Sequence, residues 1–234
     1  MRDTTLNLIA ISIFGVTMMA LLGPMLHLSP AVPAVIIVGL LGTATLDQLG
    51  LEGRIGNIVV DWLAWLSPQE RERVTYHEAG HFLVASLLGI PVQDYTLSTW
   101  QAWKKGLPGQ GGVIFDVSGL DEELTITISA HTINRYCQIW MAGIAAEQII
   151  YGGSTGGNDD CQRLNQLWQS LGRSPASAQI QQRWALLQAK TLIEKHEDLL
   201  QSLYQAMAIA TPVADCQTLI AEGSQDQSVA GGLS

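Results

Sequence analysis

The uneven distribution of apolar residues is the feature that most limits how this sequence can fold. Of its 234 residues 47% are hydrophobic and 14% are charged, and the apolar residues concentrate before about residue 50. Residues 6–28 carry one ionisable side chain, His27. A helix of that length would cross a hydrocarbon core of about 30 Å, so we predict a transmembrane helix here. A cleaved signal peptide is the competing interpretation, and the apolar run that follows argues against it.

That second apolar run covers residues 31–46, is interrupted by Pro33 and ends at Asp47. It is somewhat short for the roughly 20 residues that a helix needs to span a bilayer. Together the two runs predict a transmembrane helical hairpin over residues 1–50. Its turn would lie at residues 23–24 or at residues 29–30, where glycine, serine and proline occur.

The arginines place the ends of this hairpin. Arg2 precedes the first run, Arg54 follows the second, and the connection between them has no lysine or arginine. The positive-inside rule then puts both ends, and the larger domain, on the cytoplasmic side of the lipid bilayer. Residues 51–66 have apolar residues and tryptophans at helical spacing, which predicts an interfacial linker helix; a helix buried in the domain is the alternative.

Charge and cysteine content exclude other classes of protein. The net charge is -9 and the twelve lysines and arginines form no basic stripe, so we expect no nucleic acid partner. Cys137, Cys161 and Cys216 form no CxxC pair. An odd number of cysteines without such a pair suits a reducing compartment.

A helix start is encoded just before the motif His77-Glu78-Ala79-Gly80-His81. Ser67 is placed as an N-cap, Pro68 as the first helical residue and Glu70 as the partner in a capping box. Gly89 marks the expected end. The motif therefore falls in the middle of a helix.

Helical spacing gives this motif a definite chemistry. His77 and His81 are four residues apart, so their rings share one face and can bind one Zn²⁺ ion. Glu78 lies one residue round the helix. From there its carboxylate can take a proton from a zinc-bound water during attack on a peptide bond and pass it to the leaving amine.

A zinc peptidase needs a third protein ligand, and the spacing of residues leaves this ligand open. Glu147 lies in MAGIAAEQIIYGG, whose small residues would allow close packing on the motif helix. Asp159 and Asp160 follow the glycine-rich turn STGG. Asp159 and Asp160 also have a structural interpretation, since carboxylates in a first helical turn favour the helix dipole.

Three segments of the chain resemble the peptidase domain of the FtsH family of membrane-anchored, ATP-dependent zinc proteases. They are RVTYHEAGHFLVA at 73–85, MAGIAAEQIIYGG at 141–153 and STGGNDD at 154–160. A weaker similarity follows at 189–208. Together they occur in the family's order over most of residues 68–210.

The resemblance implies a site. In that family the two motif histidines and an aspartate after the STG turn bind zinc, and the motif glutamate is the catalytic base. By resemblance the ligands here are His77, His81 and Asp160, the catalytic residue is Glu78, and Glu147 is a nearby structural carboxylate. No other cofactor is expected.

The resemblance also implies a mainly α fold: an FtsH-like helical zinc peptidase domain with a small β element, covering residues 67–221. QDYTLS at 93–98 and GGVIFDV at 111–117 are expected to be the strands, and the loop between them is rich in tryptophan, lysine and glycine. Residues 222–234 are polar and are predicted to form a flexible tail.

The function expected from these features is a membrane-anchored zinc metalloendopeptidase that acts on unfolded or membrane proteins. The sequence has no Gly-Lys dipeptide and thus no phosphate-binding loop, so activity would be ATP-independent unless a separate AAA ATPase or FtsH-type subunit assists. The alternative is a non-proteolytic membrane assembly or scaffold protein that keeps the fold and the zinc site. Stand-alone relatives suggest the thylakoid or plasma membrane of a photosynthetic organism, with the domain in the cytoplasm or stroma.

Overall fold

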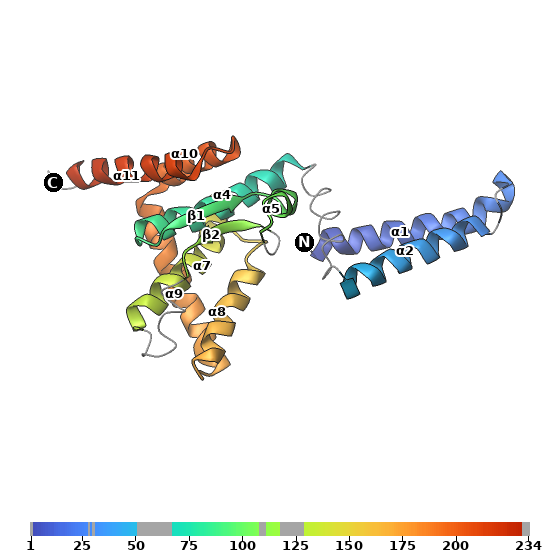
Figure 1. Cartoon of the computed structure of the whole chain (residues 1–234), viewed down its shortest axis with the longest axis horizontal. Helices are drawn as coiled ribbons and strands as arrows, with labels where there is room; N and C mark the ends of the chain where they lie inside the picture. Colours follow the sequence, from blue (N-terminus) through green and yellow to red (C-terminus); the bar gives the residue numbers. More distant parts are fainter. Residues whose placement is uncertain are drawn as a thin grey trace. The chain divides into compact units, whose positions relative to one another are not determined.

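The computed structural model describes residues 2–27, 29, 31–50, 67–107, 111–117 and 129–230 (Figure 1). The chain divides into two compact units, Met1–Pro68 and Gln69–Ser234. The predicted interfacial helix at 51–66 lies outside the described residues.

Helices α1 (Arg2–Leu22) and α2 (Ala31–Gly50) make up the first unit, with a short 3-10 helix, η1 (Gly23–Leu26), between them. Helix α1 ends at Leu22, where η1 begins. The apolar part of α1, residues 6–22, is therefore about 25 Å long at about 1.5 Å per residue. That is less than the roughly 30 Å of a hydrocarbon core. Within the described ranges no helix combines the length and the apolar content needed to cross a membrane. The predicted transmembrane hairpin is therefore not supported.

The second unit is mainly helical, as expected, with one small sheet among its described residues. Its elements are α4 (Pro68–Leu87), β1 (Val92–Thr96), α5 (Thr99–Lys104), β2 (Gly112–Phe115), α7 (Ala130–Tyr151), α8 (Asn158–Ser170), α9 (Pro175–Lys195), α10 (Glu197–Ala208) and α11 (Val213–Ala230).

Both predicted strands form, and they pair in antiparallel register with Thr96 opposite Gly112 and Tyr95 opposite Val113. The hairpin lies along α4, where Tyr95 packs edge-on against Phe82 of the motif helix (Figure 1). The segment between the strands contains α5, which the sequence did not predict.

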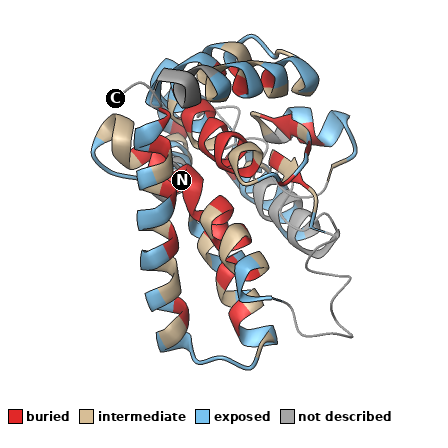
Figure 2. Ribbon diagram, turned by 90° about the vertical axis from the view of Figure 1, so that its left-hand side faces the viewer, coloured by how far each residue is buried: buried red, intermediate tan, exposed pale blue. Residues whose placement is uncertain are grey.

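Helices α4 and α7 cross at small residues, as the two motifs predicted. A β-carbon built on Gly80 would lie 2.6 Å from the carbonyl oxygen of Ala142 and 2.7 Å from the Ala146 β-carbon, so only glycine fits at this crossing. The buried residues lie on the faces that the helices turn toward one another (Figure 2). This crossing brings the motif helix against MAGIAA.

The prediction of a flexible tail from residue 222 is wrong for most of that segment, because α11 continues to Ala230. Cys216 and Ile220 are buried at helical spacing on α11. Gly223 then contacts the side chain of Leu199 in α10. Packing of this face holds the polar sequence in a helix.

All three cysteines are free thiols, and Cys137 and Cys216 are buried. Burial raises the pKa of Cys137 to about 12, so its thiol stays protonated and unreactive near neutral pH.

Candidate metal centre

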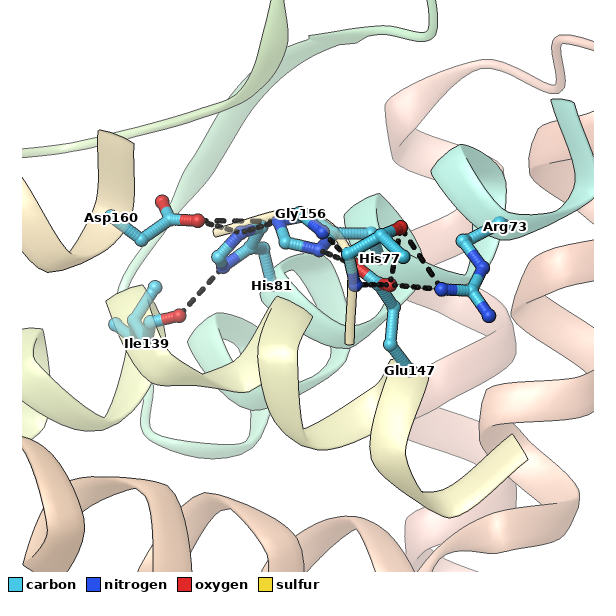
Figure 3. A network of polar contacts seen from close by, with 8 residues as sticks. Arg73, His77, His81, Ile139, Glu147, Gly156 and Asp160 are labelled. Carbon is cyan, nitrogen blue, oxygen red and sulfur yellow. Dashed lines mark hydrogen bonds and ion pairs between the residues drawn. The ribbon is translucent and has the colours of Figure 1, made fainter. Parts of the chain in front are cut away.

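Helix α4 carries His77, Glu78 and His81 in its middle, where the helix is deepest in the second unit. His81 is 5% exposed, and the two imidazole rings lie with centroids 4.8 Å apart. Both rings point toward α7 and the start of α8 (Figure 3). Since Glu78 is one residue round the helix, its carboxylate points instead to the β1–β2 hairpin.

A backbone carbonyl fixes the tautomer of His81. Its Nδ1 lies 2.7 Å from the carbonyl oxygen of Ile139 in α7 (Figure 3). A carbonyl oxygen can only accept a hydrogen bond, so Nδ1 carries the proton. The neutral ring then presents an unprotonated Nε2 on its other side.

A buried carboxylate does the same for His77. Nδ1 of His77 donates to Oε1 of Glu147 at 2.8 Å, and Glu147 is 1% exposed. The carboxylate also accepts bonds from Arg73 Nη1 at 3.3 Å, Thr155 N at 2.9 Å and Gly156 N at 3.3 Å. Burial opposes ionisation of Glu147, but these donors outweigh it and lower its pKa. In the neutral ring of His77, Nε2 is thus the unprotonated nitrogen.

The carboxylate of Asp160, in the first turn of α8, completes the group. Its Oδ2 lies 3.2 Å from Nε2 of His77 and 3.4 Å from Nε2 of His81. Glu147 reaches only the far nitrogen of His77, and Asp159 is exposed. Of the three candidates for a third ligand, Asp160 is the one that the fold brings to both histidines.

These three atoms suit one small cation. The two Nε2 atoms are 3.1 Å apart, and both lie within 3.4 Å of the Asp160 oxygen, so one ion could contact all three atoms. Ligands at about 2.0–2.2 Å from a tetrahedral zinc ion would be roughly 3.3–3.5 Å apart, close to the separations found here. The residue types, two imidazoles and a carboxylate, are common zinc ligands.

Without a metal, a proton occupies this position. Burial disfavours a charged His77, but the carboxylates of Asp160 and Glu147 outweigh burial and raise its pKa to about 10. Burial likewise opposes ionisation of Asp160, and the two histidines overcome it, lowering its pKa far below its usual range. The site therefore attracts positive charge strongly.

Glu78 is not one of the three converging residues, although its carboxylate helps to raise the pKa of His77. Its Oε2 accepts a hydrogen bond from the backbone N–H of Val113 in β2 at 2.9 Å. A β-carbon built on Gly112 would lie 3.3 Å from the same oxygen, so the strand passes directly over the carboxylate. The hairpin thus fixes the position of the proposed base.

Several contributors to the site have no signal in the sequence analysis. The Ile139 carbonyl and the Val113 N–H are backbone groups, which any residue type provides. Gly143 is required because any side chain there would collide with the ring of His77, and Arg73 acts through Glu147. Gly143 lies four residues before Glu147 and therefore on the same face of a helix, which is the available sequence signal that both contact the same partner.

No protein-family model matches this chain. Among curated proteins, it is similar to the ATP-dependent zinc metalloprotease FtsH of Synechococcus sp., at 32% identity over 112 residues. That alignment covers 45% of this chain and 16% of the relative. The protein of the same name from Clostridium perfringens is 32% identical over 43% of this chain and 13% of its own length. ATP-dependent zinc metalloprotease FtsH 2 of Symbiobacterium thermophilum is 31% identical over 45% of this chain and 17% of its own.

Part of this chain is distantly similar to FtsH zinc metalloproteases. The matches span about a sixth of the length of these relatives.

Proposed function

We propose that the chain is a zinc metalloendopeptidase in which His77, His81 and Asp160 hold the metal and Glu78 is the general base. The observation that carries the proposal is the convergence of three lone-pair atoms within 3.4 Å of one another beside a separate glutamate. A structural zinc site would need the first feature and not the second. The similarity to FtsH proteins supports the same chemistry.

When bound, a zinc ion supplies Lewis acidity, which polarises a peptide carbonyl and makes water acidic enough to lose a proton near neutral pH. The ring of His77 is kept in place by Glu147, and that of His81 by the Ile139 carbonyl, so neither moves as charge develops. Glu78 would accept the proton of the attacking water at a carboxylate oxygen. It would then deliver that proton to the nitrogen of the departing amine.

Substrates and partners belong to the proposal too. We propose that the substrates are unfolded or membrane protein segments, because an extended chain can add to the edge of a two-stranded sheet. Folded substrates would depend on a separate AAA ATPase or FtsH-type subunit for delivery.

Attachment to a membrane surface is proposed for α1 and α2. Apolar side chains are widely exposed on α1, among them Leu6, Ile11, Ile13 and Phe14, and contact with lipid would cover them. Flotation of the full chain with vesicles of neutral and anionic lipid tests this. Recovery in the protein-only fraction would contradict attachment.

The decisive experiment compares the wild-type full chain, in mild detergent, with the variants Glu78→Gln and His81→Ala. Metal content and cleavage of casein, an unfolded protein, are measured for each. Glu78→Gln should keep its zinc and lose cleavage by roughly 10²- to 10⁴-fold, because the base is removed while the metal ligands stay. His81→Ala should lose both. Full zinc content with no cleavage by the wild type, with and without candidate partners, would favour a scaffold function instead.

A further inference from the structure

Two tryptophans are exposed on α5, between the strands of the hairpin. Trp100 and Trp103 are 49% and 56% exposed, and their rings stack with centroids 4.9 Å apart. Nζ of Lys104 lies 5.5 Å from the centre of the Trp100 ring. The side chains of Trp100 and Trp103 together form an exposed apolar surface, which we call the α5 aromatic surface. Exposure of such large side chains in pairs is typical of binding surfaces.

The α5 aromatic surface is held firmly to the sheet. Ser98 caps the helix by accepting a hydrogen bond from Gln101 N, and the side chain of Gln101 accepts one from Leu97 N at 2.9 Å. Ala102, between the two tryptophans, is fully buried. The tryptophans are therefore displayed from a fixed base.

The same hairpin connects this surface to the proposed base. A β-carbon on Gly112 would lie 3.3 Å from Oε2 of Glu78, and one on Gly111 would lie 3.6 Å from the Ala102 β-carbon. Trp103 follows Ala102 directly. Two successive residues of the hairpin, Gly111 and Gly112, thus contact α5 and the proposed base respectively.

We propose that the α5 aromatic surface binds apolar side chains of an extended polypeptide to one side of the bond that is cleaved. This rests on the proposed function, and it names the substrate feature that the site selects: unfolded segments with exposed aromatic or aliphatic residues. Exposed indole rings offer a large apolar contact area to such side chains, with little loss of conformational freedom.

A lipid surface is a different partner, and the charges argue against it. Recognition of anionic headgroups typically uses a cluster of several lysines and arginines. On α5, Lys104 lies over Trp100 and the adjacent Lys105 is paired with Asp94 at 2.6 Å. Two lysines, one of them paired, are fewer than such a cluster contains, so we favour a polypeptide.

The test measures binding separately from catalysis. Two fluorescein-labelled unstructured peptides are compared, identical except that a Phe-Leu pair in one is Ser-Ser in the other. Each is titrated against the full chain carrying Glu78→Gln, with and without Trp100→Ala and Trp103→Ala together. The tryptophan replacements should weaken binding of the Phe-Leu peptide about tenfold and change binding of the Ser-Ser peptide less than about twofold.

Trp184→Ala on α9 is the matched control, because it removes another exposed tryptophan. It should leave both affinities unchanged. Circular dichroism melting of each variant checks that the fold is intact, and the paired Trp→Phe variant should restore most of the binding. Equal affinity for the Phe-Leu peptide with and without the tryptophans would overturn the proposal.

Sedimentation with anionic vesicles is run on the same variants. If the double replacement reduces vesicle binding and leaves peptide binding intact, the surface binds lipid and the proposal is wrong. Peptide binding by the Glu78→Gln chain does not depend on cleavage, so it can succeed even if the proposed peptidase activity is absent.

Discussion

The two sides of helix α4 differ in how firmly they hold their side chains. Toward α7 and α8, His81 is buried and His77 is partly buried, and each is fixed through its Nδ1 to a second partner. Toward the hairpin, the described residues give Glu78 one hydrogen bond, from the Val113 N–H. The side that would hold the metal is part of the core, while the side that would move protons meets a strand edge. Substitutions on the two sides of α4 should therefore affect metal binding and the proposed catalysis separately.

Removal of Asp160 should break the metal side most completely. Asp160→Ala takes away the atom that lies within 3.4 Å of both histidines, so we expect zinc content to fall from about one per chain to nearly none. Asp159→Ala changes the exposed neighbour and should leave zinc content at the wild-type level. Mass spectrometry of the metal in both proteins measures this. Zinc retained by Asp160→Ala would refute the assignment of the third ligand.

Protons should compete with zinc for the metal side. The pKa of His77 without metal is about 10, so near neutral pH its ring binds a proton that zinc must displace. The affinity of the chain for zinc should therefore rise about tenfold per pH unit from pH 6.5 to 8.5. Competition with a chelator whose own pH dependence is known measures this. In the metal-free chain, the stabilisation from protonated His77 is complete below about pH 6.5 and is lost as pH rises through about 10. A zinc affinity that stays constant between pH 6.5 and 8.5 would contradict the expected competition between zinc and protons.

Glu147 should affect metal binding less than a direct ligand does. Glu147→Gln places an amide group among Arg73 and the N–H groups of Thr155 and Gly156, all of which are donors. We expect zinc affinity to fall by roughly 10- to 100-fold, as for other groups that orient a ligand. Glu72→Gln, at an exposed carboxylate bonded to Tyr151, is the control and should bind zinc normally. The same loss in both variants would point to a general charge effect.

The smallest effect is expected on the hairpin side. Val113→Pro removes the N–H that contacts Glu78, and because this N–H faces α4 no ladder bond to β1 is lost. Losing one hydrogen bond of about 1 kcal/mol should lower kcat/KM roughly fivefold without changing zinc content. Val113→Ala keeps the N–H and should retain most of the activity. If zinc content falls in Val113→Pro, the two sides are not independent.

Local signals in the sequence predicted the frame of the site well. The helix start at Pro68 and the end before Gly89 follow from capping residues and glycine, and both expected strands form. The close packing of α4 on α7 follows from Gly80 and MAGIAA. The spacing of residues left Glu147, Asp159 and Asp160 equivalent, because the loop that brings α8 to α4 is a tertiary feature. The resemblance to FtsH favoured Asp160.

Other features depend on contacts that composition does not reveal. The polar residues after 222 resemble a tail, but the buried face at Cys216 and Ile220 continues the helix beyond them. The apolar run at 6–28 reads as one helix, and η1 divides it at Gly23. The Ile139 carbonyl and the Val113 N–H belong to the backbone, so no residue type marks them.

That Glu78 is not one of the proposed metal ligands has an evolutionary consequence. A single substitution at this position would end the proposed hydrolysis while leaving those ligands and the buried core in place. Lineages of such proteins could therefore lose cleavage in one mutational step and keep a folded, metal-loaded domain for selection to reuse. Descendants of the two kinds would differ at residue 78 before they differed in architecture.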